Sequence, residues 1–327
     1  MAWLLIAFHL PLALLRNPSS KGPLVIPPPR IDVIVTSNSI PSHPSMYVIS
    51  SCVAALAKHV RLPNGTRTLL MHDGVPPSAS AKRVAHFAEY RRRVERWLAP
   101  SATAAAPPLT LEAAFLPNHR NLSGTVRAAL ERVRGPWVLL CQHDLHFARA
   151  FDALAVAADM AWSEHTMNAM RHVRFNMWGN TPRGDDAGPL YGKVLRAPMY
   201  RYTRSNGWSD QNHLTKLGYY EQVVWPTIAA AARQGYRRCR DMHGKYHGNR
   251  ARFMEDCMNP IVHEANEAEH SQKWGTWLMG APGAEAYVSH LNARKTALRG
   301  SAKLGGKLRW GQRVDRQPYN QEFLFKD

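Results

Sequence analysis

Continuous apolar stretches alternate with stretches of helical periodicity along the first half of the chain. Each continuous stretch has the length of one strand and ends in small, polar or acidic residues; the stretches cover 31–37 (IDVIVTS), 66–74 (TRTLLMHDG) and 137–141 (WVLLC). Such runs are typical of strands that are covered on both faces of a parallel sheet. A further short strand is expected near 111–115.

Apolar residues at helical spacing fill the intervals between these strands. They cover 45–60 and 81–99, and Ser123 is expected to cap a third helix from Gly124 to about Arg134. The resulting β-α-β-α-β-α-β order predicts a three-layer α/β domain with right-handed crossovers and a mainly parallel central sheet. The carboxyl ends of the strands would then form the edge at which such domains bind ligands.

Composition divides the chain into four parts. Residues 1–30 join an apolar stretch, MAWLLIAFHLPLALL, to a Pro-rich linker, and 301–327 form a basic tail. Between them, 31–150 carry the regular pattern and 151–300 complete the same domain. The apolar stretch is shorter than the roughly 20 residues that span a bilayer. It is compatible with a signal-peptide core, a clipped signal anchor or a buried helix.

Basic residues exceed acidic ones by a wide margin. The 327-residue chain contains 42 Lys and Arg against 24 Asp and Glu, a formal net charge of +18. This field attracts anions, whether nucleic acid, anionic lipid or phosphorylated small molecules, and the scattered basic residues do not select among them. The sequence lacks GxGxxG and GxxxxGK[ST], which argues against a dinucleotide dehydrogenase and a P-loop enzyme.

Metal-compatible side chains follow the strand at 137–141. They are Gln142, His143, Asp144 and His146. They would emerge at the ligand-binding edge of the sheet. The alternative is a loop aspartate that caps a helix, beside histidines without a role.

The strand ending at Ser37, the strand ending in Asp73, the helix introduced at Asn121 and the motif Asp144-Leu145-His146 occur in this order. Together they resemble the nucleotide-binding half of GT-A-fold glycosyltransferases, especially family 2-like ones, over about residues 31–150. The resemblance implies a GT-A-like (Rossmann-like) domain. It also implies a metal-dependent glycosyltransferase that moves a sugar from a nucleotide-diphosphate donor to a hydroxyl of a glycan, protein or lipid.

In that family an Asp-x-Asp motif at this strand end holds a cation that bridges the donor diphosphate. Asp144-Leu145-His146 is similar to the Asp-x-His variant of polypeptide N-acetylgalactosaminyltransferases. The resemblance therefore implies a metal site formed by Asp144, His146 and the late His290. It would hold Mn²⁺ more readily than Mg²⁺, which prefers oxygen ligands.

The resemblance also implies contacts with the nucleotide-diphosphate donor. The expected donor-binding residues are Ser37, Asp73, Arg127 and Asp144. Asp73 would meet the base or ribose, although its His-Asp-Gly context is equally a turn signal. Arg127 would approach the diphosphate or else lie in solvent.

The segment Phe253-Met254-Glu255-Asp256 looks like the acidic acceptor-side motif of the same enzymes. Adjacent residues point in different directions, so only one acid can face the site. Asp256 is the expected base and Glu255 the alternative. A base at this position implies inversion at the anomeric carbon. The Asp-x-His variant, in contrast, belongs to a retaining family. Of the two outcomes, we favour inversion.

The aromatic and polar stretch at 199–226 suits either a sugar pocket or the core. Its candidates for acceptor binding are Trp208, Asp210, Asn212 and His213.

The four cysteines are too few for a disulfide framework. Cys52 and Cys141 lie in apolar surroundings and are expected in the core. Cys239 and Cys257 lie in one polar region and could pair in an oxidising compartment, or contribute to a zinc site with nearby histidines.

The apolar N-terminus and two glycosylation sequons, at Asn64 and Asn121, favour the secretory pathway or the Golgi. Membrane association would then use the N-terminal segment; the alternative location is the cytoplasm.

Two other functions compete with glycosyl transfer. A nucleic-acid-binding protein would use the positive field and aromatic stacking, but no nucleic-acid partner is expected. A metal-dependent phosphoesterase or nucleotidyl transferase would need more strand-end carboxylates than the sequence offers.

Overall fold

The computed structural model describes residues 30–39, 43–99, 109–181, 186–239 and 253–291. The apolar N-terminal stretch and the basic tail at 301–327 lie outside these ranges. In the described part of the chain, no helix has the length and hydropathy needed to cross a membrane.

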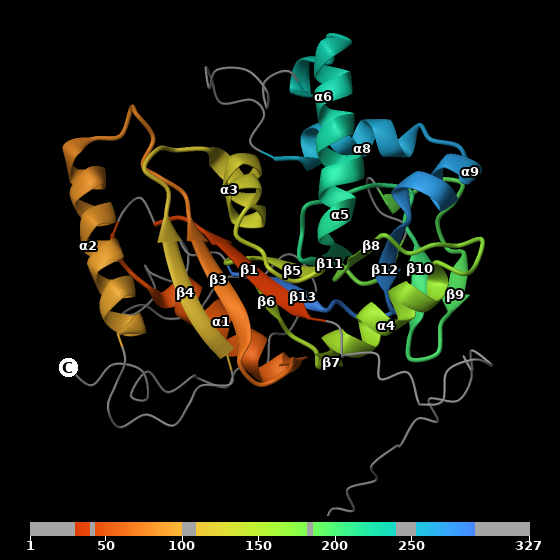
Figure 1. Cartoon of the computed structure of the whole chain (residues 1–327), viewed down its shortest axis with the longest axis horizontal. Coiled ribbons are helices and arrows are strands. Elements are labelled where there is room, and N and C mark those ends of the chain that lie inside the picture. Colours follow the sequence, from red (N-terminus) through yellow and green to blue (C-terminus); the bar gives the residue numbers. More distant parts are fainter. Residues whose placement is uncertain (1–29, 40–42, 100–108, 182–185, 240–252, 292–327) are drawn as a thin grey trace, which may run out of the picture.

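A nine-stranded sheet forms the centre of the described structure (Figure 1). Its strands are β1 (Ile31–Ser37), β3 (Thr66–His72), β4 (Leu109–Phe115), β5 (Trp137–Gln142), β8 (His172–Arg174), β9 (Val194–Arg196), β10 (Arg201–Arg204), β11 (His213–Lys216) and β12 (Thr276–Met279). Their order is β4-β3-β1-β5-β11-β8-β12-β10-β9. The first four pair in parallel, whereas β11 and β10 run against both of their neighbours.

Two short ladders lie beside the sheet. β2 (Val60–Arg61) pairs in parallel with β7 (Phe151–Asp152), and β6 (Leu145–Phe147) pairs antiparallel with β13 (Val288–His290). The second ladder joins the segment after β5 to the end of the described chain.

Helices cover both faces of the sheet, and Figure 1 shows α3, α6 and α8 above it and α1 and α4 below it. One layer contains α1 (Tyr47–His59), α2 (Ala81–Leu98) and α4 (Ala153–Ser163). The other contains α3 (Asn121–Leu130), α5 (Leu217–Tyr219), the π-helical η2 (Tyr220–Val224), α6 (Trp225–Arg233), α8 (Glu255–His263) and the π-helical η3 (His270–Trp274). The short α9 (Glu267–Glu269) precedes η3 and buries none of its residues.

Strand alternation divides the core into two clusters, one on each face. In β1, Val33 and Val35 belong to the cluster under α1, α2 and α4, whereas Ile34 belongs to the cluster under α3, α6 and α8. This two-sided burial explains the continuous apolar runs. The predicted three-layer α/β architecture with mainly parallel strands in its central sheet is confirmed.

The helix predicted from Gly124 is displaced in the structure. α3 begins at Asn121 and ends at Leu130, so Ser123 lies inside its first turn and is not the N-cap. Asn121 has φ 56°, the one positive value among described residues other than glycine. Asparagine tolerates this conformation better than most residues, which permits the earlier start.

Candidate functional site

Hydrogen bonds tie the carboxyl ends of β3, β1 and β5 to one another. The backbone N–H of Asp73 donates to Ser37 O over 2.9 Å, and that of His143 donates to Thr36 O over 3.0 Å. The segments that follow these three strands therefore start from one edge, as expected for parallel strands. Asp144 is in the turn between β5 and β6.

Asp144 and His290 lie together at this edge. His290 Nε2 is 3.3 Å from Asp144 Oδ2, and the N–H of Leu291 donates to Asp144 O over 2.7 Å. Burial alone would raise the pKa of Asp144, but the hydrogen bond from His290 and the nearby His143 leave it lowered. The same hydrogen bond raises the pKa of His290. The pair combines an oxygen and a nitrogen donor, half-exposed and close enough to bind one cation.

His146 does not join this pair. In the β6–β13 ladder, His290 is opposite Leu145, and His146 is opposite Ser289. Since neighbouring strand residues project to opposite sides, His146 and His290 point away from each other. The described residues contain no group of three or more His, Cys, Asp or Glu side chains arranged to hold a metal ion. The structure therefore does not bring the three predicted metal ligands together: His146 is turned away from the Asp144–His290 pair.

The carboxylate of Asp73 is occupied within the protein. Its Oδ1 accepts from the N–H groups of Gly74 and Arg120, over 2.9 and 2.7 Å, and its Oδ2 lies 2.6 Å from His119 Nδ1. These contacts fix the loop after β4 against the end of β3. The hydrogen bond with Asp73 raises the pKa of His119. His119, about a quarter exposed, is thus the more accessible member of the pair, and sequence reasoning did not identify it.

Ser37 faces a buried polar chain. Its hydroxyl is 3.2 Å from Tyr90 Oη, which is in turn 3.2 Å from His72 Nδ1. Burial lowers the pKa of His72 to about 3, so this imidazole is neutral at physiological pH. The chain supports the end of β1 from the α2 side, while Ser37 itself is 6% exposed.

Arg127 lies away from the strand ends. It is exposed on the second half of α3, and its guanidinium carbon is 5.8 Å from the ring centre of Trp225 in α6. The structure therefore matches the alternative of a solvated, stacked arginine better than a contact at the sheet edge.

Asp210 links β5 to the acidic pair. Gln142 Nε2 donates to Asp210 O over 2.8 Å and lies 3.3 Å from Asp210 Oδ1. Asp210 is 4% exposed, and within the described part of the chain its Oδ2 has no hydrogen-bond partner. Burial, followed by the negative charge of Glu255, raises the pKa of Asp210 to about 7. Asp210 is thus a buried acid that changes charge near neutral pH.

The first turn of α8 carries the acidic pair. Ser209 Oγ donates to Glu255 Oε2, and Trp208 N donates to Asn259 Oδ1 over 2.9 Å. Glu255 and Asn259 are one helical turn apart, so this face of α8 meets the segment that contains Asp210. Asp256, the next residue, projects about 100° away around the helix and is half-buried.

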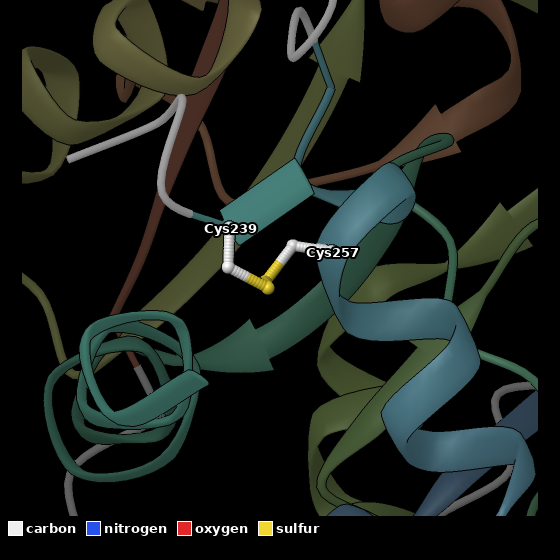
Figure 2. Close-up of a disulfide and its surroundings, with 2 residues drawn as sticks. All are labelled: Cys239 and Cys257. Carbon is white, nitrogen blue, oxygen red and sulfur yellow. A yellow bond between two sulfur atoms is a disulfide. The ribbon is translucent and has the colours of Figure 1, made fainter. Parts of the chain in front are cut away.

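A disulfide between Cys239 and Cys257 fixes the same turn of α8 (Figure 2). Cys257 follows Asp256 directly, and Cys239 lies beyond the end of α6. The pairing that the sequence left open is therefore present, and it excludes these cysteines as thiolate ligands of zinc. Cys52 and Cys141 are free and buried, as expected.

The other three acceptor candidates make contacts within the protein core. Trp208 is fully buried, and its ring centre is 5.2 Å from that of His172. His213 Nε2 lies 2.9 Å from Tyr220 Oη, and burial lowers the pKa of His213 to about 4. Asn212 bridges two strands, accepting from Gln142 N over 2.8 Å and donating to Leu145 O over 2.7 Å. Of the four candidates, Asp210 and Trp208 each have a buried polar atom, Oδ2 and Nε1, without a hydrogen-bond partner among the described residues.

No protein-family model matches the chain, and no curated protein matches its sequence. Among solved structures, TarS of S. aureus, residues 1–349 in complex with UDP-GlcNAc, is similar with a TM-score of 0.40 and 11% identity. That likeness covers 80% of this chain and 58% of the TarS chain. A second TarS structure gives a TM-score of 0.39 and 12% identity, over 81% of this chain and 37% of that one. This chain thus spans less than two thirds of the structures it resembles, and likeness at this level assigns no function or residue role to it.

Proposed function

We propose that the protein is a glycosyltransferase that moves a sugar from a nucleotide-diphosphate donor to an acceptor hydroxyl. One observation carries this proposal: β5 connects two chemically different groups. The segment after it reaches the Asp144–His290 pair, and its last residue, Gln142, contacts Asp210 beside Glu255 and Asp256. Transfer from a diphosphate donor needs both a charge-stabilising end and a proton-accepting end.

The donor would lie along the edge from β3 to β5. Neighbouring strands are roughly 4.8 Å apart, so the end of β3 is about 10 Å from the end of β5. This span suits a nucleoside near Asp73 and His119 and a diphosphate near Asp144. Ser37 lies between them at the end of β1.

Asp144 and His290 would hold a divalent cation, Mn²⁺ in preference to Mg²⁺ because one ligand is a nitrogen. Two protein ligands leave the other positions to donor phosphate oxygens and water, as is common for catalytic cations. When bound, the cation neutralises the charge that develops on the leaving diphosphate.

An acid of α8 would accept the proton of the acceptor hydroxyl. The acceptor oxygen bonds to the anomeric carbon, and the bond from that carbon to the diphosphate oxygen breaks with its electron pair, releasing the nucleoside diphosphate. We assign the base to Asp256, because the carboxylate of Glu255 is already held by Ser209. Attack opposite the leaving group inverts the anomeric configuration.

The disulfide supports synthesis in an oxidising compartment, since disulfides persist in secreted proteins and those of the secretory pathway. We therefore propose a secretory or Golgi location, with membrane association through the N-terminal segment.

A screen of nucleotide sugars with Mn²⁺, detecting released nucleoside diphosphate, tests the proposal. Turnover with one donor that depends on a divalent cation supports it. Binding of single-stranded nucleic acid that weakens steeply with salt, without any donor turnover, would instead favour the nucleic-acid-binding alternative.

A further inference from the structure

An exposed tryptophan occupies a loop at the carboxyl end of β8. The loop runs from Asn176 to Asn180 (NMWGN), and Trp178 at its centre is 53% exposed. Because β8 runs in the same direction as β5, two places away in the sheet, this loop emerges at the edge that carries Asp144.

Two buried asparagines clamp this loop. Asn176 Oδ1 accepts from Trp178 N over 2.6 Å, and Asn176 Nδ2 donates to Asn180 Oδ1. Asn180 Nδ2 in turn donates to the carbonyls of Met279 and Gly280 over 2.9 and 2.8 Å. Both asparagines are at least 96% buried, being 4% and 1% exposed. The loop therefore holds the tryptophan backbone in a fixed position, with about half of the residue exposed to solvent.

Backbone hydrogen bonds join the loop to both parts of the candidate site. Asn176 O accepts from Tyr287 N over 2.9 Å, immediately before β13, which carries His290. On the other side, Phe175 N donates to Asn212 O over 2.8 Å, and Asn212 contacts Gln142 and Leu145. The base of the Trp178 loop therefore lies between the strand that carries His290 of the Asp144–His290 pair and the segment that contains Asp210.

We propose that Trp178 is the platform of an acceptor subsite and that the acceptor group it binds is a saccharide ring. The proposal rests on the proposed glycosyltransferase function and extends it to the substrate class. An indole offers a flat apolar face to the C–H surface of a pyranose, and a polar N–H at its edge. A ring fixed in advance loses little conformational freedom on binding, which is the advantage of a clamped loop.

Trp162 provides a matched control. It is 39% exposed at the carboxyl end of α4, which returns toward the start of β8 and hence the opposite edge of the sheet. A general effect of losing an exposed indole would appear at both positions, whereas a subsite depends on Trp178 alone.

Binding to an array of immobilised oligosaccharides, with linker-only and peptide spots, tests this subsite without requiring transfer. We expect the wild-type protein and Trp162→Ala to bind at least one class of saccharide. Trp178→Ala should weaken that binding about tenfold or more, as truncation of an aromatic anchor does, and Trp178→Phe should recover most of it. The melting temperature of each variant checks folding.

The outcomes separate the two proposals. Equal binding by Trp178→Ala and wild type, or absence of saccharide binding by the wild type, overturns the subsite even if donor turnover is found. A Trp178→Ala variant that loses nucleoside diphosphate affinity in place of saccharide affinity also overturns it. Absence of donor turnover together with Trp178-dependent saccharide binding overturns the transferase function and leaves the saccharide site standing.

Discussion

The imidazole of His290 lies 3.3 Å from the carboxylate of Asp144, although Asp144 is near the middle of the described chain and His290 is near its end. The β6–β13 ladder brings them together, because it pairs the strand after Asp144 with the last described strand. The late strand therefore completes the edge of the sheet at which the early strands end.

Replacement of Asp144 by Asn tests the charge at this pair. A half-exposed strand-end carboxylate contributes more to cation binding than to packing. We expect divalent-dependent turnover to fall by at least about two orders of magnitude, with the melting temperature nearly unchanged. Release of nucleoside diphosphate and thermal unfolding measure the two effects. A variant active at ordinary Mn²⁺ concentration would show that Asp144 is not a ligand.

His290→Gln and His146→Gln form a second comparison. Because His146 projects to the other side of the ladder, its replacement should leave Mn²⁺ affinity within about twofold, whereas loss of a ligand at His290 should weaken it about tenfold or more. Calorimetric titration with Mn²⁺ distinguishes them. If His146→Gln is the weaker binder, the ladder does not separate the two imidazoles in solution.

The pH dependence of Mn²⁺ binding follows from the raised pKa of His290. Imidazole binds metal only when neutral, so protons compete as the pH falls through the raised pKa, which lies above the ordinary value of about 6.5. We expect affinity to decline at a higher pH than a free histidine would give. A decline confined to about pH 4 would indicate ligation by carboxylate alone.

The effect of Asp210 on the pH dependence of stability is opposite in sign to that of an ordinary carboxylate. Its folded-state pKa of about 7 lies above the unfolded value of about 3.8, so between these values the folded protein retains a proton that the unfolded chain has lost. Stability then decreases as the pH rises through this window. Asp210→Asn should flatten the dependence of the melting temperature on pH between pH 5 and 8. At pH 8 the variant should be more stable than the wild type. If the variant keeps the wild-type dependence of melting temperature on pH, Asp210 is not the group that retains the proton.

Asp256→Asn should lower turnover by about two orders of magnitude or more, the usual contribution of a general base, while donor binding persists. Glu255→Gln should be milder, since its carboxylate is bound by Ser209. Steady-state kinetics and nucleotide titration measure the two quantities. The reverse ranking would transfer the base to Glu255.

Reduction of the disulfide should loosen α8 more than the rest of the domain. Its cysteines are separated by 18 residues in sequence, and closing a loop of that size stabilises a protein by about 3 kcal/mol in the chain-entropy model. We expect hydrogen exchange to rise first in the turn that carries Glu255 and Asp256. A Cys239→Ser, Cys257→Ser variant that keeps wild-type exchange there would exclude this anchoring role.

Local patterns predicted β1, β3 and β5 well, because these strands are six or seven residues long and buried on both faces. They failed in the second half, where β8 and β9 have three residues each and β11 has four, too few to establish a period. The position of β11 between β5 and β8 depends on contacts between residues far apart in the sequence, which no local pattern can predict.

The candidate site shows the same division. The sequence placed Asp144 at a strand end, and the structure brings His290 to it. The sequence could not show that a one-residue alternation in β6 turns His146 away, or that backbone N–H groups occupy Asp73. Such facts depend on register and on loop contacts, which are set by the tertiary fold.

Because side chains alternate along β1, adjacent residues of this strand pack against different helical layers. Val35 supports the layer of α1, α2 and α4, whereas Ile34 supports the layer that includes α8 and hence the acidic turn. Directed evolution of this protein could therefore adjust the rigidity of the two layers separately, through substitutions one position apart in a single strand.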